Sequence, residues 1–73
     1  MKKTYRMQNL DCADCAAKME NKINEIDGVT SAKISFIMQK LTIEADENDI
    51  ERIIREAQKI CKKFEPDCKI IGG

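Results

Sequence analysis

The sequence predicts an α+β fold in which two helices cover one face of a four-stranded antiparallel sheet. Three observations lead to this expectation. Two segments repeat apolar residues every three or four positions, as amphipathic helices do. Four short segments alternate polar and apolar residues, as half-buried strands do. The segments follow one another in the order strand, helix, strand, strand, helix, strand.

The first half of the chain contains a strand, a helix and a second strand. The first strand is expected over residues 4–8, and the helix over residues 13–26. Asp27 and Gly28 are expected to stop this helix, since Gly28 suits a left-handed backbone at a helix end. The second strand is expected over residues 29–36. The apolar face of the helix consists of Ala16, Met19, Ile23 and Ile26.

The second half completes the pattern. A tight connection around residues 38–40 leads into a third strand that ends at residue 45, and the acidic residues 46–49 offer N-caps for a second helix. Pro66 ends this helix, and a last strand is expected over residues 67–71, before Gly72 and Gly73. The order βαββαβ is that of a ferredoxin-like fold, in one domain spanning residues 1–73. The apolar face of the second helix is Ile50, Ile53, Ile54, Ala57, Ile60, Cys61 and Phe64.

Composition excludes several classes of function. The 13 basic and 13 acidic residues cancel, so no basic field favours nucleic acid or anionic lipid. Apolar runs are only a few residues long, too short to cross a bilayer, and the amino terminus does not resemble a signal peptide. We therefore expect a cytosolic monomer whose four cysteines remain free or bind metal.

Cys12 and Cys15 are the candidate chemical groups. A Cys-x-x-Cys pair at a strand-to-helix junction can aim both sulfurs at one point, where unpaired helix N–H groups favour thiolates. Such a pair binds a soft metal or performs redox chemistry. Asp11 either adds a carboxylate to the two thiolates or caps the helix. Asp14 is expected to interact with the helix dipole.

The remaining candidates have supporting or structural roles. Leu10 is expected to anchor the loop against the core. Cys61 and Cys68 continue apolar faces, so we expect them to be buried and inert. The four methionines are scattered, and the sequence contains no histidine to serve as a ligand.

The loop Asn9-Leu10-Asp11-Cys12-Ala13-Asp14-Cys15 resembles the Gly-Met-x-Cys-x-x-Cys motif of heavy-metal-associated domains. Its Asp-Cys-x-x-Cys form is most similar to the amino-terminal domains of zinc-, cadmium- and lead-exporting P-type ATPases. Residues 15–20, 27–29 and 64–67 also resemble this branch. Asn9 stands where glycine is usual. Leu10 stands where many copper domains have methionine, a difference that favours metals other than copper.

The resemblance implies a function. Cys12, Cys15 and Asp11 would bind Zn(II), Cd(II) or Pb(II), with Cu(I) less favoured, and Phe64 would pack near the site together with Leu10. The chain would not be an enzyme by itself. It would be the regulatory or metal-delivery domain of an ATP-driven translocase, on the cytoplasmic side of the plasma membrane, with the other domains of that ATPase as partners.

Two other functions are considered. A free-standing copper or mercury metallochaperone would have the same fold. A thiol–disulfide oxidoreductase also uses Cys-x-x-Cys after a strand. The chain is short for a thioredoxin-like fold and its element order differs, and the charges of Asp11 and Asp14 would oppose thiolate formation.

Overall fold

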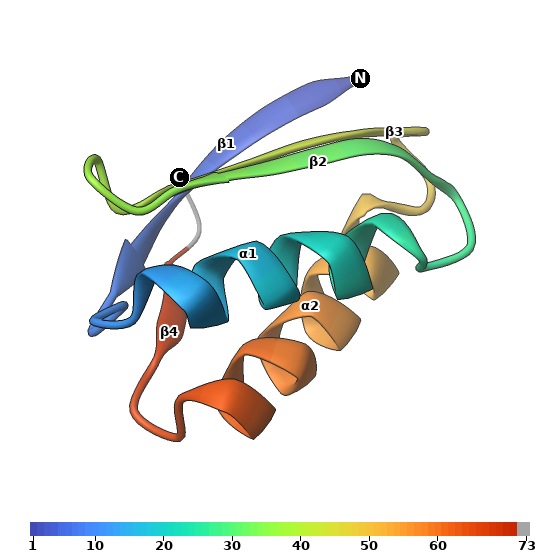
Figure 1. The fold of residues 1–73 in the computed structure, drawn as a ribbon. Helices are drawn as coiled ribbons and strands as arrows, with labels where there is room; N and C mark the ends of the chain where they lie inside the picture. Colours follow the sequence, from blue (N-terminus) through green and yellow to red (C-terminus); the bar gives the residue numbers. More distant parts are fainter. Residues whose placement is uncertain (72–73) are drawn as a thin grey trace.

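The computed structural model describes residues 1–71 and has the predicted arrangement of layers (Figure 1). Four strands form one antiparallel sheet in the order β2-β3-β1-β4. Two helices lie side by side on one face of this sheet. The α+β, ferredoxin-like fold is therefore confirmed. The elements are β1 (Lys2–Gln8), α1 (Ala13–Asn24), β2 (Val29–Ser35), β3 (Lys40–Ala45), α2 (Ile50–Phe64) and β4 (Lys69–Ile71).

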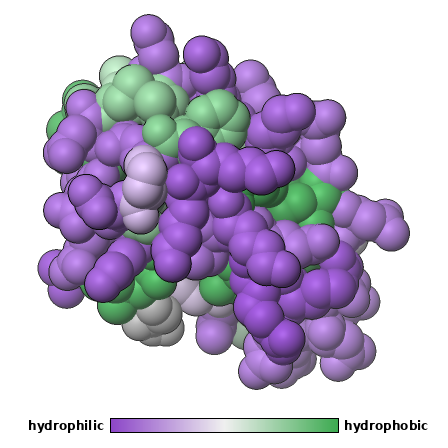
Figure 2. Space-filling view, turned by 90° about the horizontal axis from the view of Figure 1, so that it is seen from below, coloured by the Kyte–Doolittle hydropathy of each residue, from purple (hydrophilic) through white to green (hydrophobic). Residues whose placement is uncertain are grey.

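The core lies between the sheet and the helices. Alternation along β1 and β3 turns Tyr5, Met7, Leu41 and Ile43 toward the helices, where all four are buried. The buried positions of α1 are Ala16, Met19 and Ile23, and those of α2 are Ile50, Ile53, Ala57 and Cys61. Viewed from the helix side, the surface is mostly hydrophilic with separate apolar patches (Figure 2). Hydrophobic burial between the two layers therefore holds the fold together.

The other face of the sheet is polar. Lys2 lies opposite Glu44 across β1 and β3, an opposite-charge pair that favours this register. Thr4 lies opposite Thr42, with their hydroxyl oxygens 3.4 Å apart. A slip by one residue would turn these polar side chains into the core, so the alternation fixes the pairing.

Several element boundaries differ from the sequence expectation. Helix α1 ends at Asn24 and not at residue 26, because the Asn24 amide bonds to Ala32 and the chain turns into β2. Gly28 has the expected positive φ, 98°, but it lies in the turn before β2 and not at the helix end. Strand β1 extends back to Lys2, which pairs with β3.

The last strand is also shorter than expected. Strand β4 begins at Lys69 instead of residue 67, because the Cys68 N–H donates to the Glu65 carbonyl in a turn. Phe36 falls in the turn after β2, which ends at Ser35. Gly72 and Gly73 lie outside the described residues.

Helix α2 begins after Asp49, as the acidic segment predicts, but the Asp49 side chain makes no capping hydrogen bond. Its backbone is already helical, and its carboxylate lies 3.7 Å from the Arg52 guanidinium. No helix within residues 1–71 is long and apolar enough to cross a membrane.

Helix side chains bind both edge strands of the sheet. On β2, the Asn24 amide exchanges two 2.9 Å hydrogen bonds with the main chain of Ala32. The Ile34 N–H on the same strand donates to the Glu20 carboxylate at 3.0 Å. At the opposite edge, the Gln58 amide donates to the Cys68 carbonyl and accepts from the Ile70 N–H. Each helix is thereby fixed to the strand beside it.

Candidate metal site

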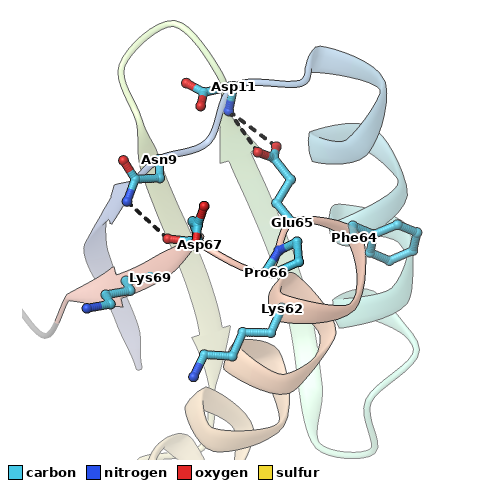
Figure 3. Close-up of a pocket in the computed structure, with 8 residues that line it drawn as sticks. All are labelled: Asn9, Asp11, Lys62, Phe64, Glu65, Pro66, Asp67 and Lys69. Carbon is cyan, nitrogen blue, oxygen red and sulfur yellow. Dashed lines mark hydrogen bonds between the residues drawn. The ribbon is translucent and has the colours of Figure 1, made fainter.

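Asn9 directs the chain out of β1 and into the cysteine loop. Its φ of 62° lies in the left-handed region, which asparagine adopts more readily than most residues with a side chain. Its side-chain amide donates to the Asp67 carbonyl at 3.0 Å (Figure 3). Asn9 therefore adopts the kind of backbone conformation for which glycine is usually selected, and it adds a tie to the segment before β4.

Leu10 anchors the loop, as the sequence predicts. Its side chain is only 1% exposed and belongs to the core cluster. Its N–H and carbonyl both bond to the side chain of Gln39. The loop is therefore fixed to the body of the protein one residue before Asp11.

Cys12 is the N-cap of α1. Its backbone is extended, and its Sγ accepts a hydrogen bond from the Cys15 N–H at 3.1 Å. Its carbonyl accepts from the Ala16 N–H at 3.0 Å, which closes the first turn of the helix. The capping residue is thus Cys12 and not Asp11, the alternative that the sequence left open. Both cysteine side chains are partly exposed at the helix start.

The two thiols interact electrostatically. A hydrogen bond to Cys12 raises the pKa of Cys15 to about 11, and partial burial and the charges of Cys12 and Glu65 act in the same direction. Lys18 has the opposite effect. The sequence suggested that helix N–H groups would favour thiolates here, but for Cys15 these causes outweigh that effect. Its proton is retained at neutral pH until something displaces it.

The Glu65 side chain binds the main chain of the cysteine loop, a contact that the sequence did not reveal. Its carboxylate accepts the Asp11 N–H, at 3.2 Å to each oxygen (Figure 3). It also accepts the Cys12 N–H at 3.0 Å. Glu65 follows α2 directly, 53 residues from Cys12. The sequence signals at this position were an acid just after a helix and the resemblance of residues 64–67 to the zinc- and cadmium-exporting branch. The residue places a second carboxylate beside the loop.

Asp11 is exposed, and its carboxylate points away from Glu65 (Figure 3). Within residues 1–71, no three cysteine, aspartate or glutamate side chains are gathered in a metal-binding arrangement. The structure therefore brings Cys12 and Cys15 together but does not bring the Asp11 carboxylate to them. Metal ligation by Asp11 stays a prediction. Asp14 lies in the first turn of α1, where a negative charge is favourable.

Phe64 is partly buried and packs against the core. It shares an open surface depression with Asp11 and Glu65, but its ring points away from both of their side chains (Figure 3). Phe64 therefore lies near the loop without facing it. The full lining of this depression is Asn9, Asp11, Lys62, Phe64, Glu65, Pro66, Asp67 and Lys69.

The other two cysteines lie in the core, as predicted. Cys61 and Cys68 are both 0% exposed. Burial raises the pKa of Cys61 to about 12, and the neighbouring Cys68 and Glu65 add to this increase. Burial also raises the pKa of Cys68. A neutral, inaccessible thiol is a poor nucleophile and a poor ligand.

Residues 4–64 match the sequence profile of the heavy-metal-associated domain. A cadmium, zinc and cobalt-transporting ATPase of Helicobacter pylori is 45% identical over 49 residues, which are 67% of this chain and 7% of that protein. A zinc/cadmium/lead-transporting P-type ATPase of Escherichia coli is 35% identical over 54 residues, which are 74% of this chain and 7% of that protein. The chain thus spans about 7% of the length of these relatives.

A solved structure has the same fold. It is the N-terminal domain of a potential copper-translocating P-type ATPase from Bacillus subtilis in the Cu(I)-loaded state. The TM-score is 0.74 at 22% sequence identity, and the match covers 96% of this chain and 82% of that one. At this identity the likeness concerns the fold and not the choice of metal.

Proposed function

The chain belongs to the heavy-metal-associated domain family, and we propose that it binds Zn(II), Cd(II) or Pb(II) through Cys12 and Cys15, with Asp11 as a third ligand. One observation carries the proposal. The two cysteines lie together at the start of α1, where both are partly exposed and the Cys12 Sγ accepts the Cys15 N–H at 3.1 Å. Thiolate sulfur suits each of these ions.

The charge around the loop supports a divalent cargo. Two thiolates and the Asp11 carboxylate would leave a site of net charge near minus one around a divalent ion, and Glu65 adds a further negative charge at the loop main chain. A divalent ion gains about twice as much from such a field as Cu(I) does. The names of the two ATPase relatives, which include zinc and cadmium, agree with this choice.

The site is suited to passing a metal on. Two or three ligands on a partly exposed loop leave a coordination position to which a partner's ligand can bind before Cys12 or Cys15 releases the ion. The Asp11 carboxylate, which is exposed, can move to the ion without disturbing the core. A closed site with four protein ligands would not exchange its ion in this way.

The whole chain, residues 1–73, is proposed to be one metal-delivery or regulatory domain of a P-type ATPase. Metal would pass to the ATPase's other domains on the cytoplasmic side of the plasma membrane. The domain itself would act as a monomer and catalyse no reaction. The alternative of a free-standing copper or mercury chaperone has the same fold and differs in its metal. A redox role is disfavoured, because the ferredoxin-like order of strands and helices differs from that of a thioredoxin-like oxidoreductase.

The test is a titration of the protein and of the double variant Cys12→Ser/Cys15→Ser with Zn(II), Cd(II), Pb(II) and Cu(I). We expect the parent to prefer the divalent ions and the variant to lose tight binding of all four while remaining folded. The matched control is Cys61→Ala/Cys68→Ala, which should keep the affinity of the parent. Tight binding by the Cys12→Ser/Cys15→Ser variant would place the site elsewhere.

A further inference from the structure

The side-chain amide of Gln39 binds both main-chain polar groups of Leu10. Its Nε2 donates to the Leu10 carbonyl at 2.7 Å, and its Oε1 accepts the Leu10 N–H at 3.2 Å. We call these two hydrogen bonds the Gln39 amide bridge. The same Nε2 also donates to the Phe36 carbonyl at 2.8 Å, which ties the bridge to the turn between β2 and β3. A residue 29 positions away thus determines where the cysteine loop begins.

The bridge takes the place of a neighbouring strand. The pairing of β1 with β3 reaches Arg6, and its pairing with β4 reaches Gln8, so neither ladder includes Leu10. The Gln39 main chain contributes as well, because its carbonyl accepts the Met7 N–H at 2.8 Å. Buried polar groups that lack such partners are costly. The Leu10 main chain therefore depends on Gln39 in a region that the sheet does not cover.

Gln39 makes these contacts from a left-handed backbone at the end of the turn between β2 and β3. Its φ is 53°, a left-handed value that is uncommon for a residue with a long side chain. Such strain persists where surrounding contacts require it, and it is concentrated at functional sites. Asn9, which directly precedes Leu10, has a φ of 62°. The bridge thus joins left-handed Gln39 to the residue that follows left-handed Asn9.

We propose that Gln39 is a positioning residue for the metal site. Its amide bridge holds the main chain of Leu10, so Asp11 and Cys12 begin from a fixed point before the metal arrives. This inference rests on the proposed function. A fixed loop binds more tightly because less conformational entropy is lost on coordination. Glu65 holds the Asp11 and Cys12 N–H groups from the other side, so Gln39 and Glu65 together define the loop.

The chain offers a matched control in Gln58. Its amide forms the same kind of bridge, donating to the Cys68 carbonyl at 3.0 Å and accepting the Ile70 N–H at 2.7 Å. Both glutamines are partly buried, but the Gln58 bridge holds β4 and not the cysteine loop. Removing either bridge should cost similar stability. Only removal of the Gln39 bridge should affect the metal.

The experiment compares Gln39→Gly with Gln58→Ala by Zn(II) competition titration and amide hydrogen exchange. Glycine removes the bridge but tolerates the positive φ, so the turn should remain. We expect Gln39→Gly to lower Zn(II) affinity about tenfold, or about 1.4 kcal/mol, and to speed exchange of the Leu10 N–H. Gln58→Ala should change affinity less than about twofold and should speed exchange of the Ile70 N–H.

A second variant covers the case in which Gln39→Gly does not fold. Gln39→Asn also tolerates the positive φ, and its amide is one methylene too short to span both Leu10 groups, so its affinity should fall in the same direction. Parent-like Zn(II) affinity in a folded Gln39 variant, or an equal loss in Gln58→Ala, overturns the positioning role alone. A parent protein that binds no Zn(II) overturns the proposed function and the positioning role together.

Discussion

The two cysteine pairs have the same chemical groups in opposite environments. Cys12 and Cys15 lie three residues apart at the start of α1 and are partly exposed, and one thiol caps the helix. Cys61 and Cys68 lie at the end of α2 and just before β4, and both are fully buried. A thiol that solvent reaches can exchange its proton for a metal, whereas a thiol in the core contributes packing. Location in the fold therefore gives the two pairs different access to solvent and to metal.

One carboxylate influences both pairs. The charge of Glu65 raises the pKa of Cys15, Cys61 and Cys68, yet the largest cause differs between the pairs. For Cys15 it is a hydrogen bond to Cys12, which a metal can replace. For Cys61 and Cys68 it is burial, which persists as long as the protein is folded. A bound metal can thus remove the main cause of the raised pKa of Cys15, whereas the pKa values of Cys61 and Cys68 stay raised in the folded protein.

The largest effect should be seen in the pH dependence of metal affinity. Metal binding displaces the Cys15 proton, and the pKa of about 11 means that the free protein keeps this proton below that pH. Zn(II) affinity should therefore rise at least about tenfold per pH unit, or about a thousandfold between about pH 5.5 and about pH 8.5. Competition titration at fixed ionic strength measures this slope. A flat profile would contradict thiolate ligation at the loop.

Serine substitution should change the free energy of unfolding differently at the two cysteine pairs. Cys61→Ser places a hydroxyl in the apolar core and should lower the free energy of unfolding by about 2 kcal/mol. Cys12→Ser should be neutral or slightly stabilising, because serine is a preferred N-cap and Cys12 is the capping residue. Urea denaturation of the metal-free variants measures both changes. Equal losses in the two variants would mean that the pairs are not structurally distinct.

Asp11→Asn tests whether the Asp11 carboxylate binds metal together with Cys12 and Cys15. Removing the charge should lower Zn(II) affinity about tenfold, or about 1.4 kcal/mol, and leave Cu(I) affinity almost unchanged, because two thiolates satisfy Cu(I). Since Cys12 caps the helix, the free energy of unfolding of the metal-free protein should not change. Titration with both metals checks the first expectation and urea denaturation the second. Parent-like Zn(II) binding would show that Asp11 is not a ligand.

The smallest effect concerns the buried pair at alkaline pH. The folded protein keeps the Cys61 proton to about pH 12, whereas the ordinary value is 9.0, so above about pH 9 the unfolded state binds fewer protons. Stability from this thiol is complete below about pH 9 and should decline above it, by about 1 kcal/mol between about pH 9 and about pH 10. Comparing the parent with Cys61→Ala isolates this contribution from lysine and tyrosine titration. Parallel stability curves for the two proteins would contradict it.

Local patterns predicted the fold because they correspond to local structure. The three- and four-residue spacing in α1 and α2 and the alternation in β1 and β3 follow directly from helix and strand geometry. Boundaries were less predictable. The ends of α1 and β4 depend on hydrogen bonds of Asn24 and Glu65, and these bonds form only once the elements have packed together.

The cysteine pair was predictable from spacing, but the support around it was not. Glu65 and Gln39 contact the loop across 53 and 29 residues, and no local pattern indicates such partners. The identity of the helix cap was also unexpected, because a thiol is an unusual N-cap and Asp11 is the commoner type. The sequence thus located the reactive groups, and the tertiary contacts show what holds them.

The side chains at the sheet edges have a consequence for self-association. Exposed edge strands are templates for pairing with other chains, and this pairing leads to aggregation and domain swapping. Here Asn24 and Glu20 occupy polar groups of β2, and Gln58 occupies those of β4. The register shift between Val29 and Ser31 further interrupts the β2 edge. Opening either edge, for example with Asn24→Ala, should promote association between copies without touching the metal loop.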